Sequence, residues 1–213
     1  MLTQKRALIA AVILIAIGAL LLFIMPDEQT LGPVIKVVVL HGALVQAGLY
    51  AFLVAGVLAL VWIFKRSDGI LSWCVAVQKT AVAVWIIYAL SSMVSTKMAW
   101  GQWIAWDEPR VRSSAYVLGF ALVALALTWW VSDALFTALL NVVTAGVVWY
   151  LVKGAGVVRH PIDPLGPSTD GVFRIYALSL LVIVLCLTAL LAWAIHEGRG
   201  TSTGRILGRT AAS

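Results

Sequence analysis

The sequence predicts an all-α integral membrane protein with six transmembrane helices, and three observations support this fold class. Of its 213 residues, 62% are hydrophobic and 11% are charged, and the mean hydropathy is +1.03. A soluble domain is typically about half apolar and about a quarter charged. Six apolar stretches are long enough to cross a hydrocarbon core about 30 Å thick as helices. No series of alternating segments of about ten residues suggests a transmembrane β-barrel.

The predicted helices are separated by charged or proline-containing segments. The first begins after Lys5-Arg6 and ends before Pro26, and its long apolar run without a small-residue cleavage site favours a retained helix over a signal peptide. The six helices are predicted at about 7–24, 35–64, 70–94, 114–131, 134–152 and 172–195. Residues 1–197 therefore form one membrane domain, and the tail 198–213 is expected to be disordered.

The positions of the basic residues predict the orientation. Lys5-Arg6 flank the first helix and Lys65-Arg66 occupy a very short turn, where the positive-inside rule has most force. We therefore expect a multi-pass protein of the cytoplasmic (inner) membrane, with both termini cytoplasmic and its functional loops on the periplasmic, outer side. The three outer loops are then 26–34, 95–113 and 153–171, whereas the inner connections 65–69 and 132–133 are too short to hold a site.

Two histidines and a tryptophan-rich stretch are expected to meet at the outer face. His41 lies near the outer end of a second apolar run that is longer than the bilayer needs, and His160 lies in a proline-rich outer loop. Between them, residues 100–107 read WGQWIAWD. Two neutral imidazoles can ligate a haem iron from its two faces. Because Trp100, Trp103 and Trp106 recur every third residue, a helical or 3₁₀ turn would align them as an aromatic platform.

The basic residues of the outer face could bind the two propionates of a haem. The candidates are Lys97, Arg110, Arg112, Arg159 and Arg174. Arginine offers a planar pair of donors to a carboxylate. The alternative for each residue taken singly is structural: tryptophans anchor proteins at membrane interfaces, and a lone histidine often serves a hydrogen bond. His196, at the inner end of the sixth helix, is expected to be a solvated helix-end residue.

The stretch Trp100-Gly101-Gln102-Trp103-Ile104-Ala105-Trp106-Asp107 resembles the tryptophan-rich WWD signature of the haem-handling family that serves cytochrome c maturation. The six-span plan, with one histidine before the motif and one after it, resembles the cytochrome c maturation protein C (CcmC) branch. Three features depart from the family pattern. Ile104 stands where another Trp is common, and the basic residue after Asp107 is delayed to Arg110. His160 lies in a proline-rich loop without the aromatic neighbours expected after the second histidine.

The resemblance implies a site and a set of partners. His41 and His160 would be the axial ligands of a transiently bound haem b, and Trp100, Gly101, Trp103, Trp106 and Asp107 would form the loop at the macrocycle. Haem would pass to a periplasmic haem chaperone (CcmE-like), assisted by a small single-span subunit (CcmD-like) and ABC transporter subunits (CcmA- and CcmB-like). No nucleic-acid partner is expected.

We therefore expect a haem-binding relay in the lipid bilayer rather than a conventional enzyme. Asp107 is expected to orient the tryptophan loop, either by bonding its backbone or by pairing with Arg110 or Arg112. One alternative is a haem lyase of the same superfamily, acting directly on apocytochrome c. Another is a small-molecule transporter without haem, for which the intramembrane Lys79 would be the functional suspect. Lys79 could equally snorkel to the inner face or pair with Asp68 or Asp133, and Asn141 and Thr144 could be interhelical hydrogen-bond partners.

Overall fold

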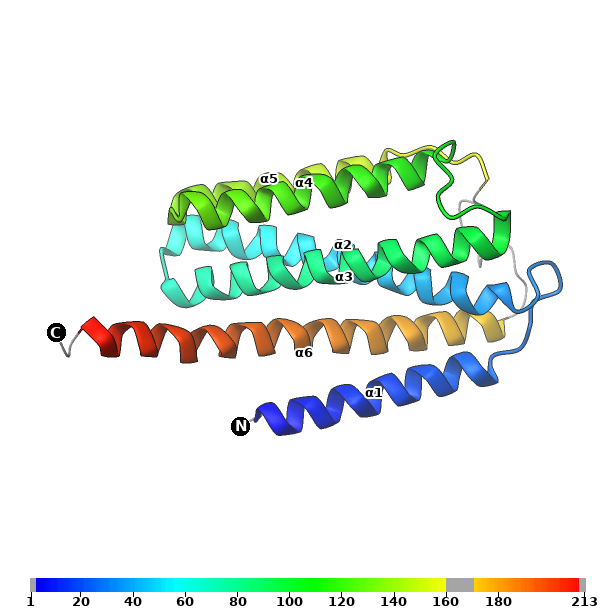
Figure 1. Cartoon of the computed structure of the whole chain (residues 1–213), viewed down its shortest axis with the longest axis horizontal. Helices are drawn as coiled ribbons and strands as arrows, with labels where there is room; N and C mark the ends of the chain where they lie inside the picture. Colours follow the sequence, from blue (N-terminus) through cyan, green and yellow to red (C-terminus); the bar gives the residue numbers. More distant parts are fainter. Residues whose placement is uncertain (1–2, 160–170, 211–213) are drawn as a thin grey trace.

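The fold is a bundle of long helices in the computed structural model, which describes residues 3–159 and 171–210, the last twelve of these as backbone only (Figure 1). Within this part of the chain the helices are α1 (Gln4–Ile24), α2 (Val34–Lys65), α3 (Asp68–Trp100), α4 (Pro109–Val131), α5 (Ala134–Lys153) and α6 (Gly171–Thr210). All six are long and apolar enough to span a membrane, which confirms the predicted number of such helices.

Local sequence accounts for where several of these helices begin and end. Asp133 caps α5, because its carboxylate accepts the N–H of Phe136 at 2.7 Å. Pro109 stands in the first turn of α4, where its missing N–H costs nothing. α3 ends at Trp100, and the next residue, Gly101, has a φ of 77° that is easy only for glycine. Short turns with left-handed residues, Arg66 and Ser132, end α2 and α4.

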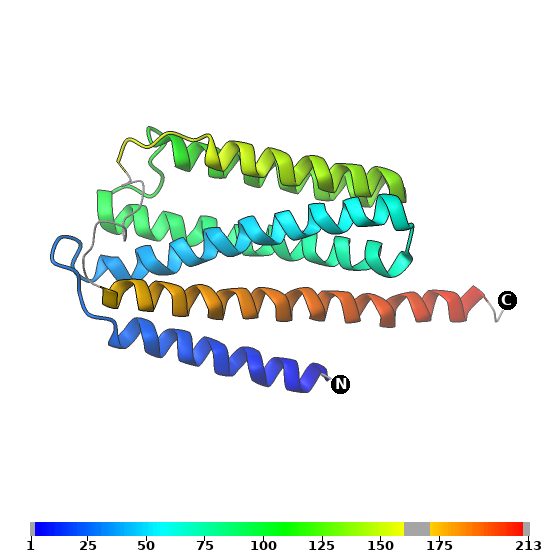
Figure 2. The same ribbon diagram turned by 180° about the vertical axis from the view of Figure 1, so that it is seen from behind.

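The two ends of the bundle differ in their connections. The α2–α3 and α4–α5 turns lie together at one end, which we name the turn end. The α1–α2 and α3–α4 connections, residues 154–159 after α5 and the start of α6 lie at the opposite, loop end (Figures 1 and 2). The described parts of the long connections thus group as the sequence predicted. Trp129 and Trp130, 84% and 81% exposed, form an aromatic fringe near the turn end, as is common at a membrane interface.

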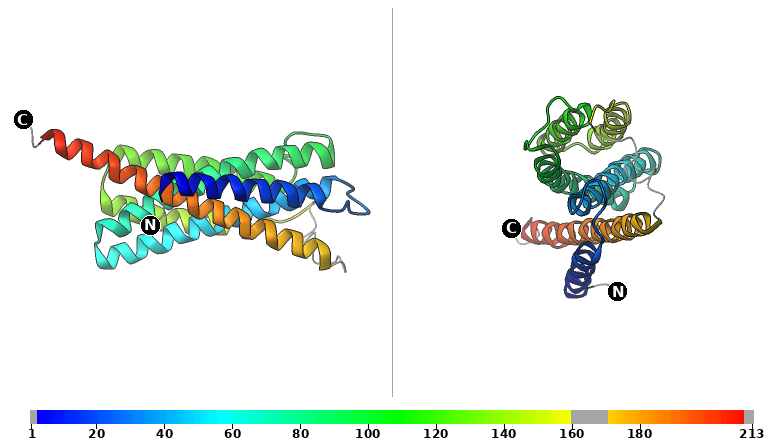
Figure 3. Two further views of the ribbon diagram at one scale, coloured as in Figure 1. Left: turned by 90° about the horizontal axis from the view of Figure 1, so that it is seen from below. Right: turned by 90° about the vertical axis from the view of Figure 1, so that its right-hand side faces the viewer.

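The helices form a core group with two additions on one side. α2 to α5 surround the bundle interior, α6 packs against α2 and α3, and α1 lies beyond α6 as the outermost helix (Figure 3). Very little of α1 is buried, so its surface is suited to lipid. The core is densest along α2 and α3, where Phe52 and Trp85 are buried with their rings 5.9 Å apart.

Small residues allow close approach of the helices in this core. A Cβ on Gly48 would lie 2.8 Å from the Trp85 ring, and a Cβ on Gly56 would lie 2.6 Å from the Cβ of Ala145. Glycine is thus required where α2 meets α3 and α5. Deeper in the bundle, the buried amide of Asn141 donates to Gln78 at 3.3 Å across the α3–α5 contact. This confirms Asn141 as an interhelical partner, whereas Thr144 donates to Leu140 of its own helix.

Three helix boundaries differ most from the sequence-based expectation. α3 continues to Trp100 and α4 begins at Pro109, so the non-helical part of the predicted outer loop 95–113 shrinks to 101–108. Polar residues do not stop a helix that protrudes beyond the apolar span, so hydropathy alone predicts helices that are too short at this end. The backbone of α6 is likewise helical to Thr210, although a disordered tail was expected from Gly198; no proline interrupts this stretch.

Candidate functional site

A cavity of about 800 Å³ opens at the loop end between the ends of the core helices. Its apolar walls come mainly from α2 and α6, including Val39, Leu49 and Phe173. Its polar lining is cationic on balance: Arg110, Lys153 and Arg159 face one acid, Glu28. The Glu28 carboxylate already accepts the N–H groups of Thr30 and Leu31 at 2.8 and 2.7 Å. The cavity therefore suits a ligand with an apolar body and negatively charged groups.

His41 lies in the wall of this cavity, one-quarter of the way along α2. Its ring is 4.9 Å from that of Tyr88. The Tyr88 hydroxyl shares a hydrogen bond of 2.7 Å with Ser114, and the indole N–H of Trp85 donates to the Ser114 carbonyl at 3.1 Å. These bonds join α3 to α4 beside the cavity, so the wall next to His41 is held by both packing and hydrogen bonds.

The tryptophan-rich stretch is split by the end of α3. Trp100 is the last helical residue and lines the cavity. Residues 101–108 are not helical, so the expectation of an aligned helical or 3₁₀ platform is wrong. Trp103 and Trp106 are 56% and 57% exposed and lie outside the cavity lining, which suggests contacts with lipid or another molecule. The αL residue Gly101 causes this change of direction, and Lys97 fixes it by donating to the Gly101 carbonyl at 2.8 Å.

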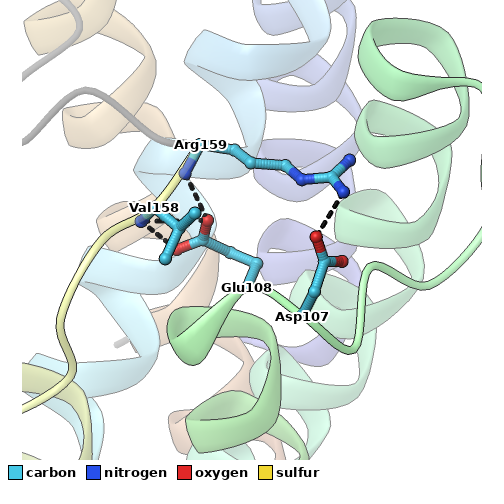
Figure 4. Close-up of polar contacts among 4 residues, drawn as sticks. All are labelled: Asp107, Glu108, Val158 and Arg159. Carbon is cyan, nitrogen blue, oxygen red and sulfur yellow. Dashed lines mark hydrogen bonds and ion pairs between the residues drawn. The ribbon is translucent and has the colours of Figure 1, made fainter.

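Arg159 connects the α3–α4 and α5–α6 connections (Figure 4). Its guanidinium pairs with Asp107 and lies 5.7 Å from the centre of the Trp100 ring. We expected Asp107 to bond the backbone of its loop or to pair with Arg110 or Arg112, and the pairing with either of these arginines is wrong. Both follow Pro109 on α4, whereas the chain after α5 brings Arg159 back to the loop. Sequence proximity favoured the wrong partners.

Glu108 holds the same two segments together through the backbone. Its fully buried carboxylate accepts the N–H of Arg159 at 2.6 Å and that of Val158 at 3.3 Å (Figure 4). At the start of α4 this negative charge also lies at the favourable end of the helix dipole. We name Asp107, Glu108, Val158 and Arg159 the loop clamp. The clamp brings Arg159 to the rim of the cavity.

Only some of the predicted site residues line the loop-end cavity. His41, Trp100, Arg110 and Arg159 share the cavity. Gly101, Trp103, Trp106, Asp107, Arg112, Lys97 and Arg174 lie outside its lining. His160 lies outside the described residues, directly after Arg159 in the chain. His196 stacks on Trp73 of α3, with the ring centres 4.1 Å apart, so it is a packed residue rather than the solvated one that was expected.

Sequence reasoning missed two polar groups of this region. Lys153, which ends α5, lines the cavity, and Glu108 anchors the loop clamp. An acid directly before a proline at the start of a helix was the available signal for Glu108. Lys153 had a signal too, since it is the basic residue that closes an apolar span at the same end as Arg159.

No protein-family model matches the sequence. No curated protein matches it either.

Proposed function

We propose that this protein binds haem in the loop-end cavity and passes it on to a haem chaperone, as a relay of cytochrome c biogenesis. The observation that carries the proposal is that His41, Trp100 and three cations line one cavity of about 800 Å³. Ligand cavities commonly measure about 300–1000 Å³. An imidazole, an aromatic ring, apolar walls and guanidinium groups match the iron, the macrocycle and the propionates of haem, respectively.

The proposed roles follow from these positions. His41 is one axial ligand of the haem iron and His160 is the second. Arg110, Arg159 and Lys153 bind the propionates, and Trp100 contacts the ring edge. Asp107 and Glu108 position Arg159 and do not touch haem. Trp103 and Trp106, exposed beside the cavity, are available to a partner such as the chaperone. A vinyl edge would remain open to that partner, whose own residue would form the bond.

The relay would work at the outer face of the cytoplasmic membrane, with the loop end periplasmic. The single-span subunit and the ABC transporter subunits, as well as the branch itself, belong to the same proposal and rest on the sequence resemblance. The sidedness is tested with two single-cysteine variants, Ile104→Cys and Arg66→Cys, each in a background without Cys74 and Cys186. Each variant is labelled from outside the cell. Labelling of residue 104 alone supports the proposal, and labelling of residue 66 alone overturns the orientation.

Propionate recognition gives a direct test of the cavity. Haem and haem dimethyl ester, which lacks the carboxylates, are titrated into the detergent-purified protein and followed by absorbance. Arg110→Gln should weaken haem binding about tenfold, the effect of losing a hydrogen bond to a charged group, and leave the ester unchanged. Lys97→Gln is the matched control, because the Lys97 ammonium donates to Gly101 away from the cavity lining. Equal loss for haem and its ester would contradict the assignment of Arg110.

A further inference from the structure

A second cavity, of about 620 Å³, lies at the turn end between α3, α4 and α5. Its walls are mainly apolar and include Leu71, Val75, Leu122 and Leu125. It is distant from the loop-end cavity, with which it shares no lining residue. A largely apolar cavity between the helices of a membrane bundle suits the acyl part of a lipid, so its few polar groups decide what it can bind.

One basic and one acidic side chain line this cavity. Lys79 follows the start of α3 by eleven residues, or about 16 Å along the helix. Side chains on a helix lean toward its N-terminus, which for α3 is the turn end. The exposed Lys79 side chain thus extends toward the α4–α5 turn, where Asp133 lines the same cavity. This placement favours the snorkelling that was one alternative for Lys79.

The hydroxyl groups of the cavity present acceptor oxygens. Thr128 donates to Ala124, Ser132 to Trp129 and Thr137 to Asp133, each through a backbone carbonyl of its own helix or turn, at 2.7–2.9 Å. Their hydroxyl protons are therefore engaged in hydrogen bonds within the protein, and their oxygens can accept a hydrogen bond from a ligand. Asp133 Oδ1 accepts the N–H of Phe136, and a carboxylate keeps further acceptor capacity. The polar part thus combines a cationic donor with an acidic group and neighbouring acceptors.

We propose that the turn-end cavity binds a zwitterionic phospholipid with a primary ammonium group, drawn from the adjacent leaflet. Lys79 binds the phosphate, Asp133 and the hydroxyl oxygens accept the ammonium N–H groups, and an acyl chain lies along Leu122 and Leu125. A quaternary ammonium has no N–H to donate to these acceptors. The exposed indole of Trp129, at the cavity edge, places the headgroup level of the bilayer at this depth.

Native mass spectrometry of the full chain in detergent tests the proposal. The probes are phosphatidylethanolamine, phosphatidylglycerol and phosphatidylcholine with identical acyl chains. Wild type should retain phosphatidylethanolamine best. Lys79→Gln should weaken its binding about fivefold, the effect of one charge near a membrane surface. Asp133→Asn removes the charge but keeps a good helix cap, so it should abolish the preference over phosphatidylglycerol without unfolding α5.

Two further variants keep the test decisive. Lys65→Gln removes an exposed cation of the turn end outside the cavity lining and should bind like wild type. Lys79→Arg keeps the charge and should also retain binding, so it separates loss of charge from loss of fold. Equal binding of the three lipids by wild type, or unchanged binding by both Lys79→Gln and Asp133→Asn, would overturn the proposal. Neither of these outcomes depends on haem binding at the loop end.

Discussion

The guanidinium of Arg159 pairs with the carboxylate of Asp107, a residue 52 positions earlier in the chain, while the backbone N–H of Arg159 donates to Glu108. Two adjacent acids thus bind one arginine, Asp107 through its guanidinium and Glu108 through its backbone N–H. The side-chain contact is half exposed, whereas the Glu108 carboxylate is fully buried. The two contacts should therefore differ in strength, and this difference can be measured.

Replacing Glu108 should destabilise the loop end more than any other single change in the clamp. Glu108→Ala leaves the N–H groups of Val158 and Arg159 without their carboxylate partner, which costs about 1–3 kcal/mol of unfolding free energy. Glu108→Gln keeps an acceptor oxygen and should cost less. The measurement is thermal unfolding in detergent, with the exposed Glu197→Gln as control. Equal stability of Glu108→Ala and the control would refute a structural role for the clamp.

Replacing Asp107 should have a small effect on stability. The side chains of Asp107 and Arg159 are 51% and 38% exposed, and exposed ion pairs contribute about 0–1 kcal/mol. A double-mutant cycle with Asp107→Asn and Arg159→Gln should give a coupling energy in this range that decreases at high salt. A coupling well above about 1 kcal/mol, or one insensitive to salt, would mean that the pair is less solvated than the structure indicates.

The α2–α5 contact should not tolerate a methyl group at residue 56. Gly56→Ala places a Cβ 2.6 Å from that of Ala145, so the helices must separate, at a cost of about 1–3 kcal/mol. Gly146→Ala is the matched control, because a Cβ at that helical position meets no atom within 4 Å. The unfolding temperature in detergent should fall for Gly56→Ala alone. A similar change in both variants would attribute the effect to glycine itself and not to helix packing.

The amide pair inside the bundle should contribute modestly to stability. Asn141→Leu removes the hydrogen bond to Gln78 between α5 and α3, and such bonds within membranes contribute about 0.6 kcal/mol on average. Unfolding of this variant, Gln78→Leu and the double variant gives the coupling energy directly. Unchanged stability together with loss of haem binding would be unexpected, since neither residue lines the loop-end cavity.

The sequence was sufficient for the architecture because the bilayer imposes simple rules. Twenty or so apolar residues must form a spanning helix, so the number and order of spans follow from hydropathy. The placement of His41, Trp100, Arg110 and Arg159 around one cavity agrees with part of the prediction that these loop-end residues meet, whereas Trp103 and Trp106 lie outside the cavity lining. That prediction needed only the alternation of spans, which brings every second connection to the same end.

The local structure of the loop could not be predicted in the same way. The spacing of three tryptophans suggested a helical platform, but Gly101 adopts a positive φ and the following residues leave the helix. The pairing of Asp107 with Arg159 depends on how two connections fold over each other, which periodicity does not encode. Glu108 was missed because burial of a charge is recognisable only when its backbone donors are known.

We propose that His41 and His160 bind haem at the loop end. The most direct measurement is the absorbance spectrum, with a pyridine haemochrome assay, of protein purified in detergent from cells that make haem. Wild type should carry near-stoichiometric low-spin haem, and His41→Ala and His160→Ala should each weaken the Soret band or make it high-spin. His196→Ala, at the turn end, should match wild type. Wild-type protein without haem, even after addition of free haem, would contradict the account.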